Sequence, residues 1–73
     1  MNALDIKKMI EAGLPDATVE VLGDDGQHFD ALVESPSFSG KTLIAQHKMV
    51  YATLGDSFES ALHALALKTS APR

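Results

Sequence analysis

The chain has 73 residues, of which 45% are hydrophobic and 22% are charged, and its formal net charge at pH 7 is −4. This composition is typical of a small folded protein, so we expect a single domain over residues 1–73 and exclude a disordered tail or a second core. No apolar stretch approaches the roughly 20 residues that cross a bilayer, and the N-terminus lacks the apolar segment of a secretory signal. We therefore expect a cytoplasmic protein with no membrane span.

The absence of cysteine limits the metal chemistry open to the chain. Disulfides, thiolate nucleophiles and cysteine-ligated metal sites are excluded. His28, His47 and His63 are then the only nitrogen side chains well suited to a borderline metal. Any thiolate ligand at a metal site has to come from a partner.

The charge is distributed unevenly along the chain. Residues 1–35 carry two lysines against eight carboxylates, whereas residues 36–73 carry four basic residues against two carboxylates. The second half is therefore mildly basic, which keeps a nucleic-acid-binding protein as an alternative. Most DNA-binding domains of this size carry a stronger basic stripe to neutralise several phosphates.

The first half of the chain predicts a helix followed by a hairpin. Asn2 can cap a helix over residues 2–12, and Gly13 provides its stop. Residues 17–22 and 28–35 each alternate apolar and polar side chains, which is the period of a half-buried strand. The two strands predict an antiparallel hairpin with one face toward the helices.

The turn of this hairpin contains two features that invite a functional interpretation. Residues 23–26 read Gly-Asp-Asp-Gly, which matches the Gly-x-x-Gly spelling of some RNA-binding loops but would aim two carboxylates at a phosphate. We interpret it as turn chemistry. His28 opens the second strand at the mouth of the hairpin, and by itself it predicts an exposed turn histidine.

A central helix is predicted after Ser35 and Pro36, which end the second strand. It begins within residues 39–42 and ends at Gly55, while Phe38 anchors the connector. At about 100° per residue, His47 falls near the middle of an apolar stripe that we expect to face the core, formed by Leu43, Ile44, Val50, Tyr51 and Leu54. A histidine there is either a structural residue with satisfied nitrogens or a metal ligand, and periodicity does not choose between them.

The end of the chain predicts a short helix over residues 56–62 and a strand over residues 63–69, with residues 70–73 frayed. A crossover through two helices should be right-handed, so the third strand runs parallel to the second. The expected fold is α+β, in the order αββααβ, with a mixed three-stranded sheet and the helices on one face.

From Phe38 onward the residues resemble the BolA family, and the similarity extends over nearly the whole chain. Several short motifs in the right order and spacing carry the resemblance: Phe38-x-Gly40-Lys41 with Leu43, His47-Lys48-Met49-Val50-Tyr51 with Leu54-Gly55-Asp56, and His63-Ala64-Leu65-x-Leu67-Lys68-Thr69. The brief hairpin turn, Gly26-Gln27-His28-Phe29, is similar to that of the IbaG-like branch.

The resemblance implies a fold like a class II KH domain and a partnership with monothiol glutaredoxins of the CGFS type. In such heterodimers a [2Fe-2S] cluster is shared with the help of glutathione. By the resemblance His47 is the ligand from this chain, His28 is the only candidate for a second position, and His63 is mainly structural. We expect no cofactor in the isolated protein, which should be a monomer or a weak homodimer.

Two further function classes compete with this non-enzymatic adaptor. A KH-like regulator that binds DNA would use Lys41, Lys48 and Lys68 for phosphate contacts, with strong salt dependence. An enzyme lacks support, because the chain has no cysteine nucleophile, no paired-carboxylate pattern and no Ser-His-acid constellation beyond chance.

Overall fold

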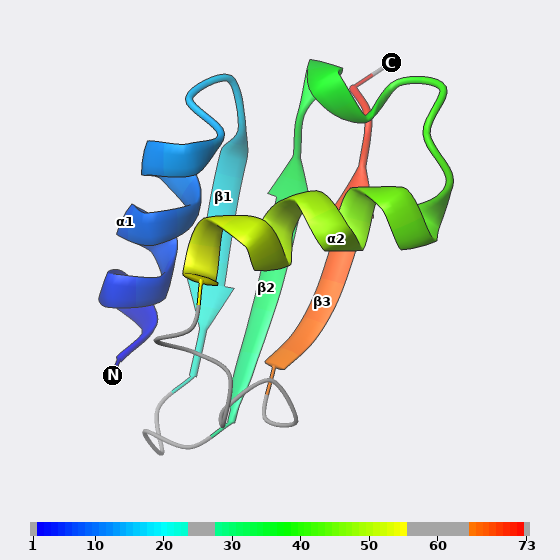
Figure 1. Cartoon of the computed structure of the whole chain (residues 1–73). Coiled ribbons are helices and arrows are strands. Elements are labelled where there is room, and N and C mark those ends of the chain that lie inside the picture. The colour runs from blue at the N-terminus through cyan, green and yellow to red at the C-terminus, as the bar shows by residue number, and fades with distance from the viewer. Residues whose placement is uncertain (1, 24–27, 56–64, 73) are drawn as a thin grey trace.

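The computed structural model describes residues 2–23, 28–55 and 65–72, which form two helices, three strands and a short 3-10 turn (Figure 1). The elements in chain order are α1 (Ala3–Gly13), β1 (Thr18–Leu22), β2 (Phe29–Glu34), η1 (Pro36–Phe38), α2 (Leu43–Leu54) and β3 (Leu65–Ser70). The predicted α+β fold is confirmed. The helix expected over residues 56–62, residues 24–26 of the predicted turn and His63 lie outside the described residues.

Helix α1 begins where the sequence predicts, because Asn2 caps it. The side chain of Asn2 accepts a hydrogen bond of 2.9 Å from the backbone N–H of Asp5, and the backbone N–H of Asn2 donates to the Asp5 carboxylate at 3.4 Å. This reciprocal pair satisfies backbone donors that have no partner within the helix, and the carboxylate lies at the positive end of the helix dipole.

The sheet has the strand order β1-β2-β3, with β1 antiparallel and β3 parallel to the central strand β2. Both helices cover the same face of this sheet, as Figure 1 shows. Strand β2 alternates strictly between buried and exposed residues, with Phe29, Ala31 and Val33 directed toward the helices. The predicted mixed sheet and its inward-facing residues are therefore confirmed.

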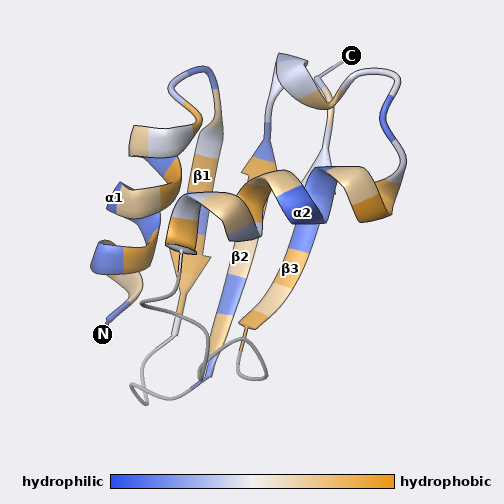
Figure 2. Ribbon diagram, viewed as in Figure 1, coloured by the Kyte–Doolittle hydropathy of each residue, from blue (hydrophilic) through white to orange (hydrophobic). Residues whose placement is uncertain are grey.

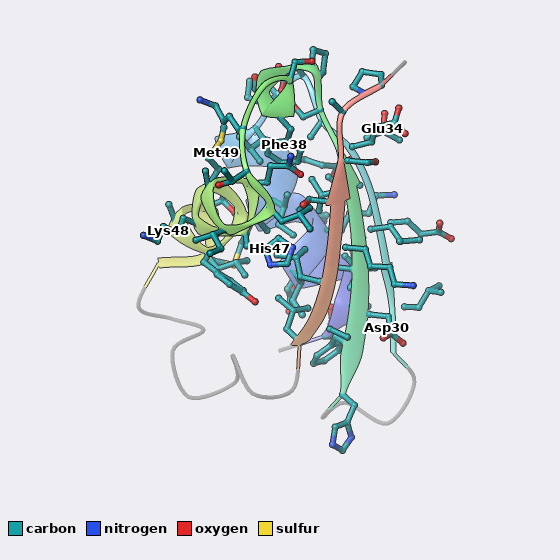
Figure 3. The ribbon with its side chains drawn as sticks, turned by 90° about the vertical axis from the view of Figure 1, so that its right-hand side faces the viewer. Asp30, Glu34, Phe38, His47, Lys48 and Met49 are labelled. Carbon is teal, nitrogen blue, oxygen red and sulfur yellow. The ribbon has the colours of Figure 1, made fainter. Side chains whose placement is uncertain are left out.

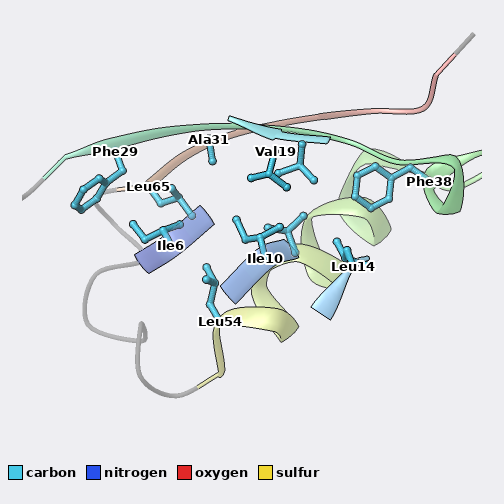
Figure 4. Close-up of a cluster of buried hydrophobic side chains, with 11 residues drawn as sticks. Ile6, Ile10, Leu14, Val19, Phe29, Ala31, Phe38, Leu54 and Leu65 are labelled. Atoms are coloured by element: carbon cyan, nitrogen blue, oxygen red, sulfur yellow. The ribbon is translucent and has the colours of Figure 1, made fainter. Parts of the chain in front are cut away.

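The core lies between the sheet and the two helices (Figure 4). Its largest fully buried side chain is Phe38, which holds the η1 connector against the core, as the sequence predicts. The other buried apolar residues come from every helix and strand: Ile6, Ile10, Leu14, Val19, Phe29, Ala31, Val33, Val50, Leu54 and Leu65.

A polar network fixes the connector between β2 and α2. The hydroxyls of Ser35 and Ser37 donate to the two carboxylate oxygens of Asp16 at 2.8 and 2.6 Å, and the backbone N–H of Ser37 donates to the Ser35 hydroxyl at 3.0 Å. The hydrogen bond from Ser37, followed by that from Ser35, lowers the pKa of Asp16 below its usual range. The connector before β1 is thereby tied to η1.

The core-facing side of α2 differs from the expected stripe. Its buried residues are Gln46, Val50 and Leu54, whereas Leu43 and Ile44 are 63% and 71% exposed. At about 100° per residue the buried side is rotated by about 60° from the predicted arc. The prediction that Leu43 and Ile44 face the core is therefore wrong.

Strand β3 extends one residue beyond its predicted end at Thr69. Ser70 is the last residue of β3, and its carbonyl accepts a hydrogen bond of 3.1 Å from the backbone N–H of Ser35. Ala71 is half-buried and packs against the core. Ser70 is thus part of the sheet, and fraying of the residues after it stays a prediction. Of the helices described, none has the length and apolar character needed to cross a membrane.

Candidate functional site

The first turn of α2 extends past the edge of the sheet. Thr42 caps the helix, its hydroxyl accepting a hydrogen bond of 3.1 Å from the backbone N–H of Ala45. Figure 1 shows that the helix crosses the sheet and that its N-terminal end projects beyond β3, the edge strand. Side chains on this turn have no strand beneath them, which explains the exposure of Leu43 and Ile44. The hydropathy colouring shows apolar residues at this projecting end (Figure 2).

Gln46 fixes the rotation of α2 against β3. It is only 7% exposed, its Nε2 donates to the carbonyl oxygen of Lys41 at 2.9 Å, and its Oε1 accepts from the hydroxyl of Thr69 at 2.7 Å. A buried amide is stable only with such partners. Helical periodicity does not predict the burial of Gln46, because its partner Thr69 lies on β3, 23 residues further along the chain.

His47 lies at the border of the buried side of α2 and not at its centre. It is half-buried, and its ring meets that of Tyr51 edge to face, with centroids 6.4 Å apart and planes at 81°. Figure 3 shows the side chain at the flank between α2 and the sheet. Within the described residues, neither ring nitrogen forms a hydrogen bond. The imidazole therefore has nitrogen lone-pair capacity that the described fold does not use.

The exposed residues of the first turn lie on the same side of α2 as His47. Leu43 is four and Ile44 three residues before the histidine, and Tyr51 is four residues after it, so the four side chains follow one another along the helix. We call this set (Leu43, Ile44, His47 and Tyr51) the α2 flank. Two large exposed apolar side chains beside an accessible imidazole are typical of a protein-facing surface.

The second predicted ligand, His28, comes from another part of the molecule. It is exposed and directly precedes Phe29, which pairs with Leu65 at the start of β3. Gln46, which precedes His47 in the sequence, contacts Thr69. Thr69 lies four residues beyond Leu65 along β3, which is about 13 Å from it. Among the described residues, no three histidine, aspartate or glutamate side chains gather as a metal-binding group.

The three lysines proposed as phosphate contacts do not share one face. Lys48 points from α2 away from the sheet (Figure 3), whereas Lys68 lies among the exposed residues of the sheet face opposite the helices. Lys41 precedes α2 and is exposed. The structure thus separates Lys48 from Lys68, and the predicted set does not form one continuous basic surface.

Comparisons with known proteins agree with this fold. The profile of the family described as BolA-like protein matches residues 3–73. A BolA homologue from Coxiella burnetii is 44% identical, covers 99% of this chain and 92% of its own, and superimposes with a TM-score of 0.84. The BolA domain of SufE1 from Arabidopsis thaliana is 32% identical over 96% of this chain and 91% of its own, with a TM-score of 0.75.

Curated relatives are matched over shorter segments. The DNA-binding transcriptional regulator BolA of Escherichia coli is 38% identical over 42 residues, which are 58% of this chain and 40% of the regulator. The chain spans less than half of three other curated relatives: 14% of SufE-like protein 1 and 31% of BOLA1 from Arabidopsis thaliana, and 42% of uvi31 from Schizosaccharomyces pombe. The family profile covers all described elements, and the chain belongs to the BolA-like protein family.

Proposed function

We propose that this chain is a non-enzymatic, cytoplasmic adaptor of the IbaG-like type that binds a CGFS monothiol glutaredoxin and shares a [2Fe-2S] cluster with it. In this role it serves iron-sulfur trafficking or iron and redox regulation. His47 is the proposed ligand from this chain, and His28 is the candidate for a second ligand.

One observation carries the proposal, namely the position of His47 on an exposed apolar flank. An imidazole sealed in the core could not reach a cluster that another molecule brings. His47 is half-buried, its nitrogens have no hydrogen bond within the described residues, and Leu43 and Ile44 beside it offer apolar area to a partner. Apolar surface next to a coordinating group is what a shared site needs, because the partner has to exclude water from it.

The donor chemistry of the chain fits a shared cluster better than a resident one. Without cysteine, imidazole nitrogens are the donors of this chain best suited to iron, and the thiolates have to come from the glutaredoxin and glutathione. Imidazole ligands in place of thiolates make a [2Fe-2S] cluster less negative and raise its reduction potential. Within such a site, this chain's residues would position one nitrogen and shield it, with Tyr51 packed against the ring.

Co-expression with a CGFS glutaredoxin tests the proposal. A coloured heterodimer should form, and its visible absorption and circular dichroism should change when His47 becomes alanine. The same spectra are recorded for three single variants, His28→Ala, His47→Ala and His63→Ala, so that each imidazole is tested in the same way. Gln27→Ala is the control, because its side chain has no imidazole nitrogen. A spectrum that His47→Ala leaves unaltered removes this residue from the coordination sphere, and a change produced by His63→Ala alone reassigns the ligand.

A second candidate function is DNA binding, which is favoured by the similarity to the DNA-binding transcriptional regulator BolA of Escherichia coli. For this chain it would depend on Lys41 and Lys48, since Lys68 lies beside carboxylates on another face. Binding should weaken steeply between about 50 and 200 mM salt if several phosphates are contacted. A gel-shift series with no retarded band at low salt eliminates this candidate.

A further inference from the structure

The face of the sheet opposite the helices carries a combination of leucines and carboxylates that the proposed function does not use. Its exposed residues form three rows across the strands, set by the strand register: Leu22, Asp30 and Ala66; Glu20, Leu32 and Lys68; Thr18, Glu34 and Ser70. We call these nine residues the outer sheet face. Figure 3 shows Asp30 and Glu34 on this face, directed away from the helices.

Two leucines form the apolar centre of the outer sheet face. Leu22 is 54% and Leu32 is 43% exposed. Leu22 pairs with Asp30, two residues before Leu32. The two leucines are therefore diagonal neighbours, at a distance of about 7–8 Å. Hollows of about 520 and 420 Å³ lie on this face, and Leu32 and Lys68 line both of them. Leu32 is therefore a ridge with room on either side for apolar side chains of a partner.

The charges around this centre select the partner. Glu20, Asp30 and Glu34 stand against the single cation Lys68. The surplus of negative charge disfavours nucleic acid and anionic lipid surfaces. It also disfavours a second copy of this chain, because Asp30 and Glu34 flank Leu32 on the central strand and would meet like charges in a face-to-face pairing.

We propose that the outer sheet face binds a basic amphipathic polypeptide segment. Neighbouring apolar side chains of such a segment would contact Leu22 and Leu32, while its lysines or arginines would pair with Glu20, Asp30 and Glu34. One apolar stripe of a helix is wide enough to cover both leucines. This surface lies on the other side of the sheet from the α2 flank, so an adaptor could hold a cluster partner and a second protein at once.

The test uses the full ¹⁵N-labelled chain and a 14-residue helical peptide that has leucines on one face and lysines elsewhere. The expected chemical-shift changes fall on the three strands around Leu32. Leu32→Ser and Leu22→Ser should each weaken the affinity about tenfold, since each removes an apolar anchor. The double variant Glu20→Gln/Glu34→Gln should weaken it and reduce its salt dependence. Leu43→Ser, at a leucine of the α2 flank that is 63% exposed, is the matched control and should bind as the parent does.

Several outcomes overturn the proposal. These are no binding at low salt, shifts on the α2 flank in place of the strands, equal affinity for Leu32→Ser, or equal affinity for a peptide in which serine replaces leucine. Shifts of the same strands caused by duplex DNA, or by raising the protein concentration alone, would assign the face to nucleic acid or to a second copy. Circular dichroism of each variant verifies folding, and His47→Ala should leave the peptide affinity unchanged, so this test is independent of the cluster proposal.

Discussion

The hydroxyl of Thr69 on β3 donates a hydrogen bond of 2.7 Å to Oε1 of Gln46 on α2, and Gln46 is buried. The same amide donates to the carbonyl oxygen of Lys41, just before the helix. One side chain thus ties the start of α2 to the edge strand and fixes the rotation of the turn that carries His47. The position of His47 therefore depends on the hydrogen bond between Gln46 and Thr69, which helical periodicity does not predict.

Replacing Gln46 by alanine should destabilise the fold by about 2–4 kcal/mol, because it leaves a cavity and removes the hydrogen-bond partner of the Thr69 hydroxyl. In a double-mutant cycle with Thr69→Val, the two changes should couple by about 1 kcal/mol. Urea unfolding measures both quantities. Lys48→Ala, at an exposed position of the same helix, is the control and should stay within about 0.5 kcal/mol of the parent. Strict additivity of the two changes would show that the hydrogen bond contributes nothing to stability.

The exposed leucine and isoleucine of the α2 flank should matter for partner binding and not for folding. Leu43→Ser and Ile44→Ser should each alter the free energy of unfolding by less than about 0.5 kcal/mol, yet weaken the glutaredoxin complex about tenfold or more. Isothermal titration calorimetry measures the affinity. Leu4→Ser, a change at a leucine of α1 that is 57% exposed, is the matched control. Equal affinities for all three variants would mean that the partner docks elsewhere.

Gly13 is required by the close approach of the two helices. A Cβ atom at this position would lie 2.5 Å from Cγ2 of Thr53 on α2. Replacing glycine by alanine normally stabilises a helix by up to about 1 kcal/mol. Here the overlap with Thr53 should reverse the sign, so Gly13→Ala should destabilise the fold by about 1–3 kcal/mol. Thermal unfolding of Gly13→Ala measures the effect, and adding Thr53→Ser should recover part of it. A stabilised Gly13→Ala variant would contradict this packing.

The network at Asp16 should make stability depend on pH in the acid range. Hydrogen bonds from Ser37 and Ser35 favour the ionised carboxylate and lower its pKa in the folded state. Their contribution is therefore complete above the unfolded-state pKa of about 3.9 and is lost as the pH falls through the lower folded value. Asp16→Asn should remove this part of the pH dependence, and Ser37→Ala should reduce it. Urea unfolding between pH 2.5 and pH 6 compares the three proteins, and identical slopes would disprove the linkage.

Much of the fold follows from local patterns in the sequence. Every second residue of β2 is apolar, so its buried face could be predicted, and the spacing of Asn2 and Asp5 predicts the cap of α1. The parallel pairing of β2 with β3 follows from chain connectivity. These features depend on neighbours within a few residues or on general rules of handedness.

The orientation of α2 could not be predicted in this way. The hydropathy pattern alone assigns Leu43 and Ile44 to the core, because it carries no information on how far the sheet extends beneath the helix. The sheet ends at β3, so the first turn of α2 has nothing to pack on, and polar Gln46 is buried because Thr69 and the Lys41 carbonyl satisfy it. The observed rotation of α2 places His47 at the accessible border of its buried side and not at the middle.

The central claim, that the imidazole of His47 binds iron shared with a glutaredoxin, is tested most directly by pulsed electron paramagnetic resonance of the reduced heterodimer. With this chain ¹⁵N-labelled and the glutaredoxin and glutathione unlabelled, a strong ¹⁵N hyperfine coupling should appear, because only this chain supplies labelled nitrogen. The account predicts that the coupling from the His47 imidazole is lost in His47→Ala, so that the total coupling falls or vanishes, and that it persists unchanged in the Gln27→Ala control. A coupling of undiminished strength in His47→Ala, or none in the parent complex, would contradict it.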